Sequence, residues 1–166
     1  MVKTLLLTIM MSSIAAFLGS AHAEDEKINN YYFVWYAASV GDVHMDIEKT
    51  QEGLKVLLSS PGGALARISP APATAVAIGE ALKRDTVTYY DKQMKKEDYN
   101  AEDMVPVGGY KIYYRSSRGQ KFEVSVRAPG LLSAAVIMTK DEALKIADSL
   151  LKAETMAALV DKRVQP

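Results

Sequence analysis

The chain has 166 residues, no cysteine, two histidines and equal numbers of basic and acidic side chains, 20 of each. The absence of cysteine excludes disulfides, a thiolate nucleophile and a cysteine-ligated zinc site. A formal net charge of zero gives no electrostatic reason to expect a nucleic acid or an anionic membrane as a partner.

The first 23 residues predict a secretory signal peptide. A basic start with Lys3 precedes an apolar run from Leu5 to Leu18, and the small residues Ala21 and Ala23 follow at the positions that the signal peptidase reads. The apolar run is shorter than the ~20 residues that a spanning helix needs, which argues against an uncleaved anchor. We therefore expect residues 24–166 to form a single exported domain in a bacterial periplasm or outside the cell, without stable membrane insertion after cleavage.

The first half of this domain, residues 31–92, has the pattern of four strands followed by a helix. Residues 31–36 are aromatic or β-branched on both faces, and residues 43–48 alternate between apolar and polar. Turns containing glycine or proline separate two further predicted strands, 54–59 and 64–68. Ser69 before Pro70 predicts a helix start, with the helix continuing through Leu82 and as far as Tyr90.

The second half, residues 107–163, repeats this order after a charged segment. Residues 91–106 are charged and almost without apolar side chains, so we predict a linker of about that length. Predicted strands at 110–115, 121–127 and 133–138 follow. A capping box formed by Thr139 and Glu142 predicts the start of a helix over residues 140–162. The matching order of strands, turns and caps predicts an internal repeat.

The predicted fold class is therefore α+β, with an antiparallel sheet built from two similar βββα or ββββα halves. Two long amphipathic helices should pack on one side of this sheet. The residues expected to face the sheet or each other are Val76, Ala77, Leu82, Tyr89, Ile146, Ala147, Leu150 and Leu151.

At the level of topology, and on no sequence motif, this order resembles the PUR and whirly-type repeats. That resemblance implies binding of single-stranded nucleic acid, which gives one alternative function. Export from the cytosol and the near-neutral charge argue against it, and we expect no nucleic acid as a partner.

The sequence contains no recognised catalytic or cofactor motif. It has no Gly-x-Ser-x-Gly elbow, Walker loop, paired-glycine dinucleotide fingerprint or His-Glu-x-x-His helix, and His44 is the only histidine beyond the signal peptide. We name no catalytic or cofactor-binding residue and expect no cofactor. The favoured function is a non-enzymatic exported protein that binds another exported protein or a small ligand, and a homo-oligomer is one possibility.

Asp42, His44 and Asp46 are the candidate metal ligands. They are expected on one face of a strand, where Asp and His side chains suit a divalent transition metal. The alternative function that they suggest is a small exported hydrolase or metal-dependent enzyme. The simpler interpretation is a solvated strand face, and same-face residues ~6.6 Å apart are too distant for tridentate binding without help from another element.

Two further groups of side chains suggest binding surfaces. The aromatic residues at 31–36, with Tyr110, Tyr113 and Tyr114, are expected to fill the core, although an exposed face could stack bases or sugars. The segment 110–127 is basic, whereas 42–52 is acidic, so these two hairpins either are solvated or pair within the chain or between subunits. The candidate partner-binding residues are Lys111, Arg115, Arg118, Lys121 and Arg127.

Overall fold

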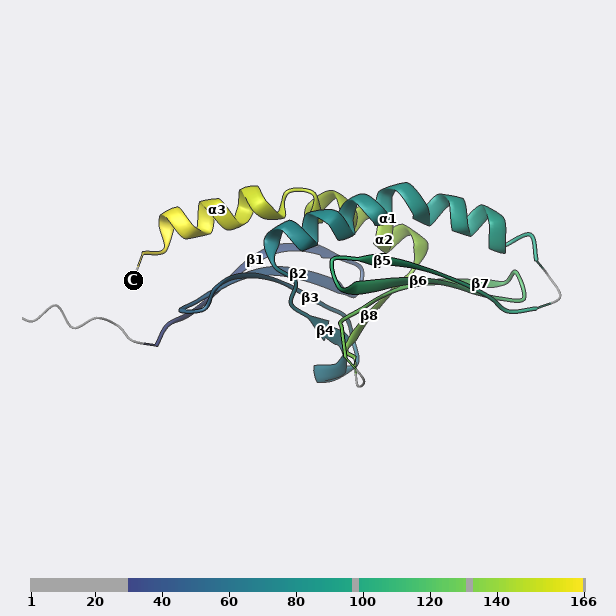
Figure 1. Ribbon diagram of the computed structural model, residues 1–166, viewed down its shortest axis with the longest axis horizontal. Coiled ribbons are helices and arrows are strands. Elements are labelled where there is room, and N and C mark those ends of the chain that lie inside the picture. Colours follow the sequence, from purple (N-terminus) through teal and green to yellow (C-terminus); the bar gives the residue numbers. More distant parts are fainter. Residues whose placement is uncertain (1–29, 97–98, 131–132, 166) are drawn as a thin grey trace, which may run out of the picture.

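The computed structural model describes residues 30–96, 99–130 and 133–165. These residues form an α+β structure with two four-stranded antiparallel sheets and three helices packed against them (Figure 1). The α+β class is therefore confirmed. The sequence predicted one sheet and two helices, and both of these details are wrong. The signal peptide predicted at 1–23 lies outside the described residues.

Each sheet has its strands side by side in chain order, and short turns join the first three strands of each sheet. The first sheet contains β1 (Tyr32–Val40), β2 (Val43–Thr50), β3 (Gly53–Ser59) and β4 (Arg67–Ile68), with a short 3₁₀ helix, η1 (Gly63–Ala66), before β4. The second sheet contains β5 (Ala101–Val107), β6 (Tyr110–Ser117), β7 (Lys121–Arg127) and β8 (Ala135–Met138). The helices are α1 (Pro72–Gln93), α2 (Lys140–Leu150) and α3 (Ala153–Arg163).

The segment predicted as a linker contains a strand. Strand β5 occupies Ala101–Val107 and pairs along its whole length with β6. Its charged and proline residues are compatible with a strand because β5 is the edge of its sheet, where one row of main-chain groups needs no partner strand.

Three smaller predictions also need correction. The predicted strand 64–68 is mostly the 3₁₀ turn η1, with only two residues in β4. Helix α1 has Ala71 as its N-cap and Pro72 in its first turn, so it begins two residues later than predicted. The predicted helix 140–162 is two helices, because the chain turns at Leu151 and Lys152 between α2 and α3.

The predicted capping box at the start of α2 is confirmed. The Thr139 hydroxyl accepts a hydrogen bond from the Glu142 amide at 3.3 Å, and the Glu142 carboxylate accepts from the Thr139 amide at 2.8 Å. The other Glu142 oxygen accepts from the Asp42 amide at 3.3 Å. This carboxylate therefore ties the start of α2 to the turn between β1 and β2.

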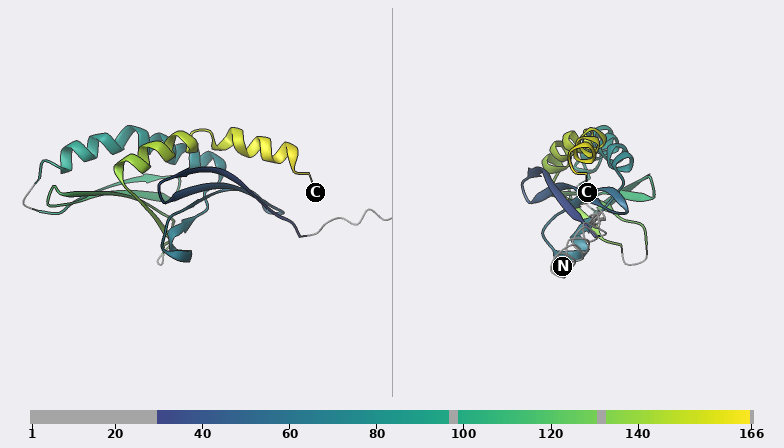
Figure 2. Two further views of the ribbon diagram at one scale, coloured as in Figure 1. Left: turned by 180° about the vertical axis from the view of Figure 1, so that it is seen from behind. Right: turned by 90° about the vertical axis from the view of Figure 1, so that its left-hand side faces the viewer.

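The three helices lie along one side of both sheets, whereas β4 and β8 project from the other side (Figures 1 and 2). Helix α1 packs on β5 and β6 of the second sheet, whereas α3 packs on β2 and β3 of the first. Each sheet is thus covered in large part by a helix from the other half of the chain. Because neither half covers its own apolar face alone, one continuous core joins them.

Of the helix residues predicted to face inward, Leu82, Ile146, Ala147 and Leu150 are buried. Val76, Ala77 and Tyr89 are half-buried. Leu151 is exposed, so its assignment is wrong, because it lies where α2 ends.

Candidate functional site

The most unusual surface of the described protein is the first half of β1. Five consecutive large side chains are exposed there, from 43% for Trp35 to 62% for Tyr36. We call residues Tyr32–Tyr36 the aromatic edge. A strand places successive side chains on opposite faces, so this exposure affects both faces of the sheet. The prediction that these aromatics fill the core is wrong for the aromatic edge, although Tyr114 is fully buried.

Packing changes abruptly along β1. The register with β2 shifts between Tyr36 and Ala38, and beyond this irregularity Ala37, Ala38 and Val40 pack against the core. Helix α2 contacts β1, and the Glu142 carboxylate reaches the turn that follows it. The aromatic edge has sparser support. The Tyr32 hydroxyl donates to Glu48 at 2.5 Å, and the Arg163 guanidinium lies 5.9 Å from the centre of the Trp35 ring.

Strands β1 and β5 are each an edge of their sheet, as are the short strands β4 and β8, and β1 and β5 differ in chemistry. Strand β1 has one paired neighbour, β2, and contains no charged residue. Strand β5 has one paired neighbour, β6, and contains Glu102, Asp103 and Pro106. Charges and proline at an edge discourage pairing with another strand, and β1 has neither. The aromatic edge is therefore more receptive to an added strand than β5 is.

A second surface lies on the side of the second sheet that faces away from the helices. Its cations gather around one ring, because the guanidinium groups of Arg115 and Arg127 lie 5.2 and 5.0 Å from the centre of the Tyr113 ring. Lys111 lies directly opposite Arg127 in the β6–β7 pair. We call Lys111, Tyr113, Arg115 and Arg127 the basic-aromatic face.

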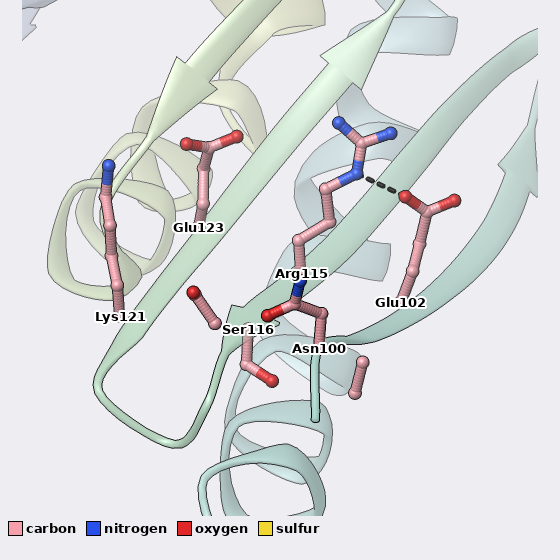
Figure 3. A pocket seen from close by; sticks show the side chains of 8 residues that line it. Asn100, Glu102, Arg115, Ser116, Lys121 and Glu123 are labelled. Carbon is pink, nitrogen blue, oxygen red and sulfur yellow. Dashed lines mark hydrogen bonds and ion pairs between the residues drawn. The ribbon is translucent and has the colours of Figure 1, made fainter. Parts of the chain in front are cut away.

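At one end of this face is a shallow polar hollow of about 520 Å³ (Figure 3). Arg115 forms an ion pair with Glu102 across β5 and β6, and Lys121 and Glu123 line the side formed by β7. Two cations and two carboxylates balance one another here. The hollow therefore offers hydrogen bonds but no net charge that would select an anion or a cation.

The five predicted partner-binding residues do not form one cluster. Arg115 and Lys121 line the polar hollow, whereas Lys111 and Arg127 line a separate hollow at the other end of β6 and β7. Arg118 lies in the turn between these strands, where its φ of 48° is left-handed. The sequence did not single out Glu102, which pairs with Arg115 from the segment predicted as a linker.

The three candidate metal ligands do not combine into a metal site in the part of the chain that the structure describes. Asp42 lies in the turn before β2, His44 is exposed on β2, and its Nδ1 lies 3.1 Å from the Ser39 hydroxyl. Asp46 is half-buried, and desolvation raises the pKa of its carboxyl. Within residues 30–96, 99–130 and 133–165, no group of three His, Asp or Glu side chains is placed to hold a metal ion.

Two acidic residues of the first sheet have ion-pair partners nearby. Glu48 lies 3.6 Å from Arg67, and Glu52 lies 2.9 Å from Lys55. Among the described residues, no ion pair joins the acidic hairpin to the basic one, so pairing of these hairpins within the chain is not observed. Pairing between subunits stays a prediction.

In the part of the chain that the structure describes, no helix combines the length and the apolar character needed to cross a bilayer. Comparison with known proteins found no family model that matches this chain and no curated protein that is similar to it in sequence.

Proposed function

We propose that this chain is an exported, non-enzymatic protein that binds another exported protein through β1. The observation that carries the proposal is the aromatic edge, a run of five exposed large side chains on an edge strand without charges. In the proposed complex, an extended segment of the partner pairs with β1, and its apolar side chains cover the aromatic residues. Main-chain hydrogen bonds would give affinity, and the side chains would give specificity.

The size of the aromatic edge is compatible with this role. A fully buried aromatic side chain removes about 150–250 Å² from water, so four aromatic residues that are roughly half exposed present on the order of 400 Å². One partner contributes about 800 Å² to an interface of standard size. The aromatic edge would therefore supply about half of such an interface, and the main chain and flanking residues of β1 would supply more.

Support for the non-enzymatic part of the proposal comes from the sequence. The chain has no cysteine, and only His44 is available as a histidine base beyond the predicted signal peptide. The predicted signal peptide supports export. A metal-dependent or hydrolytic activity centred on Asp42, His44 and Asp46 gains no support from the geometry, since these residues do not converge.

A second candidate function is binding of single-stranded nucleic acid. The basic-aromatic face favours it, because a half-buried tyrosine flanked by arginines on an open sheet can stack a base and contact its phosphate. The formal net charge of zero weighs against it, since nonspecific nucleic-acid binding depends mainly on positive charge. We therefore rank it below protein binding.

We also propose that the two halves are an internal repeat. The same strand order in both sheets supports this, as do left-handed glycines in equivalent turns, Gly41 with φ 57° and Gly108 with φ 53°. Superposing residues 40–92 on 107–162 is the test. A repeat requires matching strand directions and helix placement, whereas a mismatch would mean that common turn chemistry produced the similarity.

The proposed function can be tested by comparing pull-downs with paired variants. Val34→Lys with Tyr36→Lys places charges on two exposed positions of β1 and should block strand addition while leaving the core intact. The control is Val87→Lys, a similarly exposed apolar residue on α1. We expect the partner recovered by the parent and the control to bind the β1 variant at least ~30-fold more weakly, as expected for loss of a ~2 kcal/mol hot spot. Equal recovery by all three proteins would refute the role of β1.

A further inference from the structure

A small hollow at the end of the β6–β7 pair is lined by two cations. Lys111 and Arg127 lie directly opposite each other there, and Ser133 and the turn residues Gly109 and Gly130 also line the hollow. The hollow has a volume of about 130 Å³. Drug-sized ligands occupy pockets of about 300–1,000 Å³, so this hollow has room for one small chemical group.

The two cations lack anionic partners within the described ranges. Neither Lys111 nor Arg127 forms an ion pair there, in contrast to Arg115, which pairs with Glu102. The Arg127 Nε is buried and has no hydrogen-bond acceptor among the described residues. A buried donor of a charged group without an acceptor is unfavourable, so an external acceptor would stabilise this arrangement.

The charges on this side of the second sheet are distributed unevenly along β6 and β7. Glu102 and Glu123 both line the polar hollow at the end near Arg115, whereas none of the described residues that line the hollow at the Lys111 end is acidic. The Tyr113 ring lies 5.0 Å from the Arg127 guanidinium and restricts its position. The hollow therefore combines two kinds of donor. The Arg127 guanidinium can donate two parallel hydrogen bonds, and the neighbouring Lys111 ammonium adds a second positive charge.

From this geometry we propose that the hollow binds one tetrahedral oxyanion, a phosphate or sulfate group. Arg127 would donate two hydrogen bonds, Lys111 would balance the second negative charge, and the Ser133 hydroxyl would donate to a further oxygen. The group would be either a free ion or the exposed head of a lipid. This site is independent of protein binding through β1, because it lies on the other sheet.

Binding can be measured by titrating inorganic phosphate, and separately sulfate, into the mature protein at constant ionic strength, with chloride as the compensating anion. We expect saturable binding in ¹H–¹⁵N spectra, with shifts at the Arg127 Nε–H and at the amides of Gly109 and Gly130. Arg127→Gln should weaken binding at least tenfold, and Arg127→Lys should restore part of the loss. The control Lys121→Gln, which changes a cation in the balanced hollow, should alter affinity by less than twofold.

No saturable binding of either ion, or equal losses in Arg127→Gln and Lys121→Gln, would overturn the proposal. Unchanged dispersion of the variant spectra would show that a loss does not result from unfolding. Vesicles of phosphatidylcholine with and without phosphatidate distinguish the two sources. Phosphatidate-dependent binding that Arg127→Gln removes identifies a lipid head group, whereas binding of inorganic phosphate alone identifies a free ion. Binding of oligothymidylate without binding of either ion would contradict a single-group site and favour the nucleic-acid alternative.

Discussion

Replacing Gly79 by alanine should destabilise the protein, although alanine is the better helix former. Gly79 lies inside α1, where a Cβ atom would come within 2.9 Å of the Leu150 Cβ. It would also lie 3.1 Å from the Ala147 carbonyl oxygen and 3.2 Å from the Leu151 amide nitrogen. Carbon atoms pack best at about 3.5–4.0 Å, and two of these three neighbours are main-chain atoms that cannot turn away. The methyl group would therefore push α1 and α2 apart.

The sign of the effect depends on two opposing quantities. Helix propensity favours alanine over glycine by about 1 kcal/mol. Forcing an extra methyl group into a packed contact costs about 1–3 kcal/mol. We expect the packing cost to exceed the propensity gain, with a net loss of about 1 kcal/mol and a Tm lower by about 3 °C.

Thermal unfolding followed by circular dichroism measures the effect, and the neighbouring exposed residue provides the matched control. Glu80 is exposed, so Glu80→Ala and Glu80→Gly differ in helix propensity alone, without the contact between α1 and α2. At this position the alanine variant should melt at the higher temperature. A Gly79→Ala protein that melts above the parent by the same margin would refute the close approach of α1 and α2.

Three further outcomes are expected. A hydrogen bond from the Thr139 amide lowers the pKa of the Glu142 carboxyl below its ordinary value of 4.5. The ionised carboxylate therefore stabilises the fold fully above pH 4.5, and this stabilisation is lost as the pH falls through the lowered pKa. The difference in unfolding free energy between the parent and Glu142→Gln should therefore be largest near neutral pH and shrink below about pH 4.5 in acid titrations. A difference independent of pH would contradict the stabilising role of the ionised carboxylate. His44→Ala should change the free energy of unfolding by less than about 0.5 kcal/mol, because the side chain is exposed. A zinc- or copper-dependent rise in the Tm of the parent that the mutation removes would instead indicate a metal site at His44. Intact-mass measurement of exported protein should place the N-terminus at Glu24, and retention of residues 5–18 would show an uncleaved anchor.

Local sequence signals predicted the elements whose partners are close in the chain. The capping box at Thr139 and Glu142 predicted the start of α2, and alternation of apolar and polar residues identified β2. These signals depend on neighbouring residues, so they can be recognised without knowledge of the tertiary structure.

The errors arose where distant packing decides the structure. Charged residues in 101–107 suggested a linker because their edge position in the second sheet is set by long-range pairing. The break between α2 and α3 at Leu151 and Lys152 has neither glycine nor proline to indicate it. A local pattern also cannot show that each sheet is covered in large part by a helix from the other half of the chain.

The candidate surfaces could be predicted only in part. The sequence showed that residues 31–36 are aromatic on both faces, but the coverage of each face depends on where α2 and α3 end. It also identified Lys111 and Arg127 as members of a basic segment. That they line a different hollow from Arg115, which pairs with Glu102, required the β5–β6 and β6–β7 registers.

The most direct test of the central claim is site-specific photocrosslinking in the cells that export the protein. A photoreactive phenylalanine analogue at Val34 should crosslink to a partner protein, or to a second copy if the protein binds itself. The same analogue at Val87 on α1 should give no product of that mass. Adding the charged substitution Tyr36→Lys should abolish the Val34 product. Binding through β1 predicts this pattern, whereas crosslinks of equal yield from both positions, or none from Val34, would contradict it.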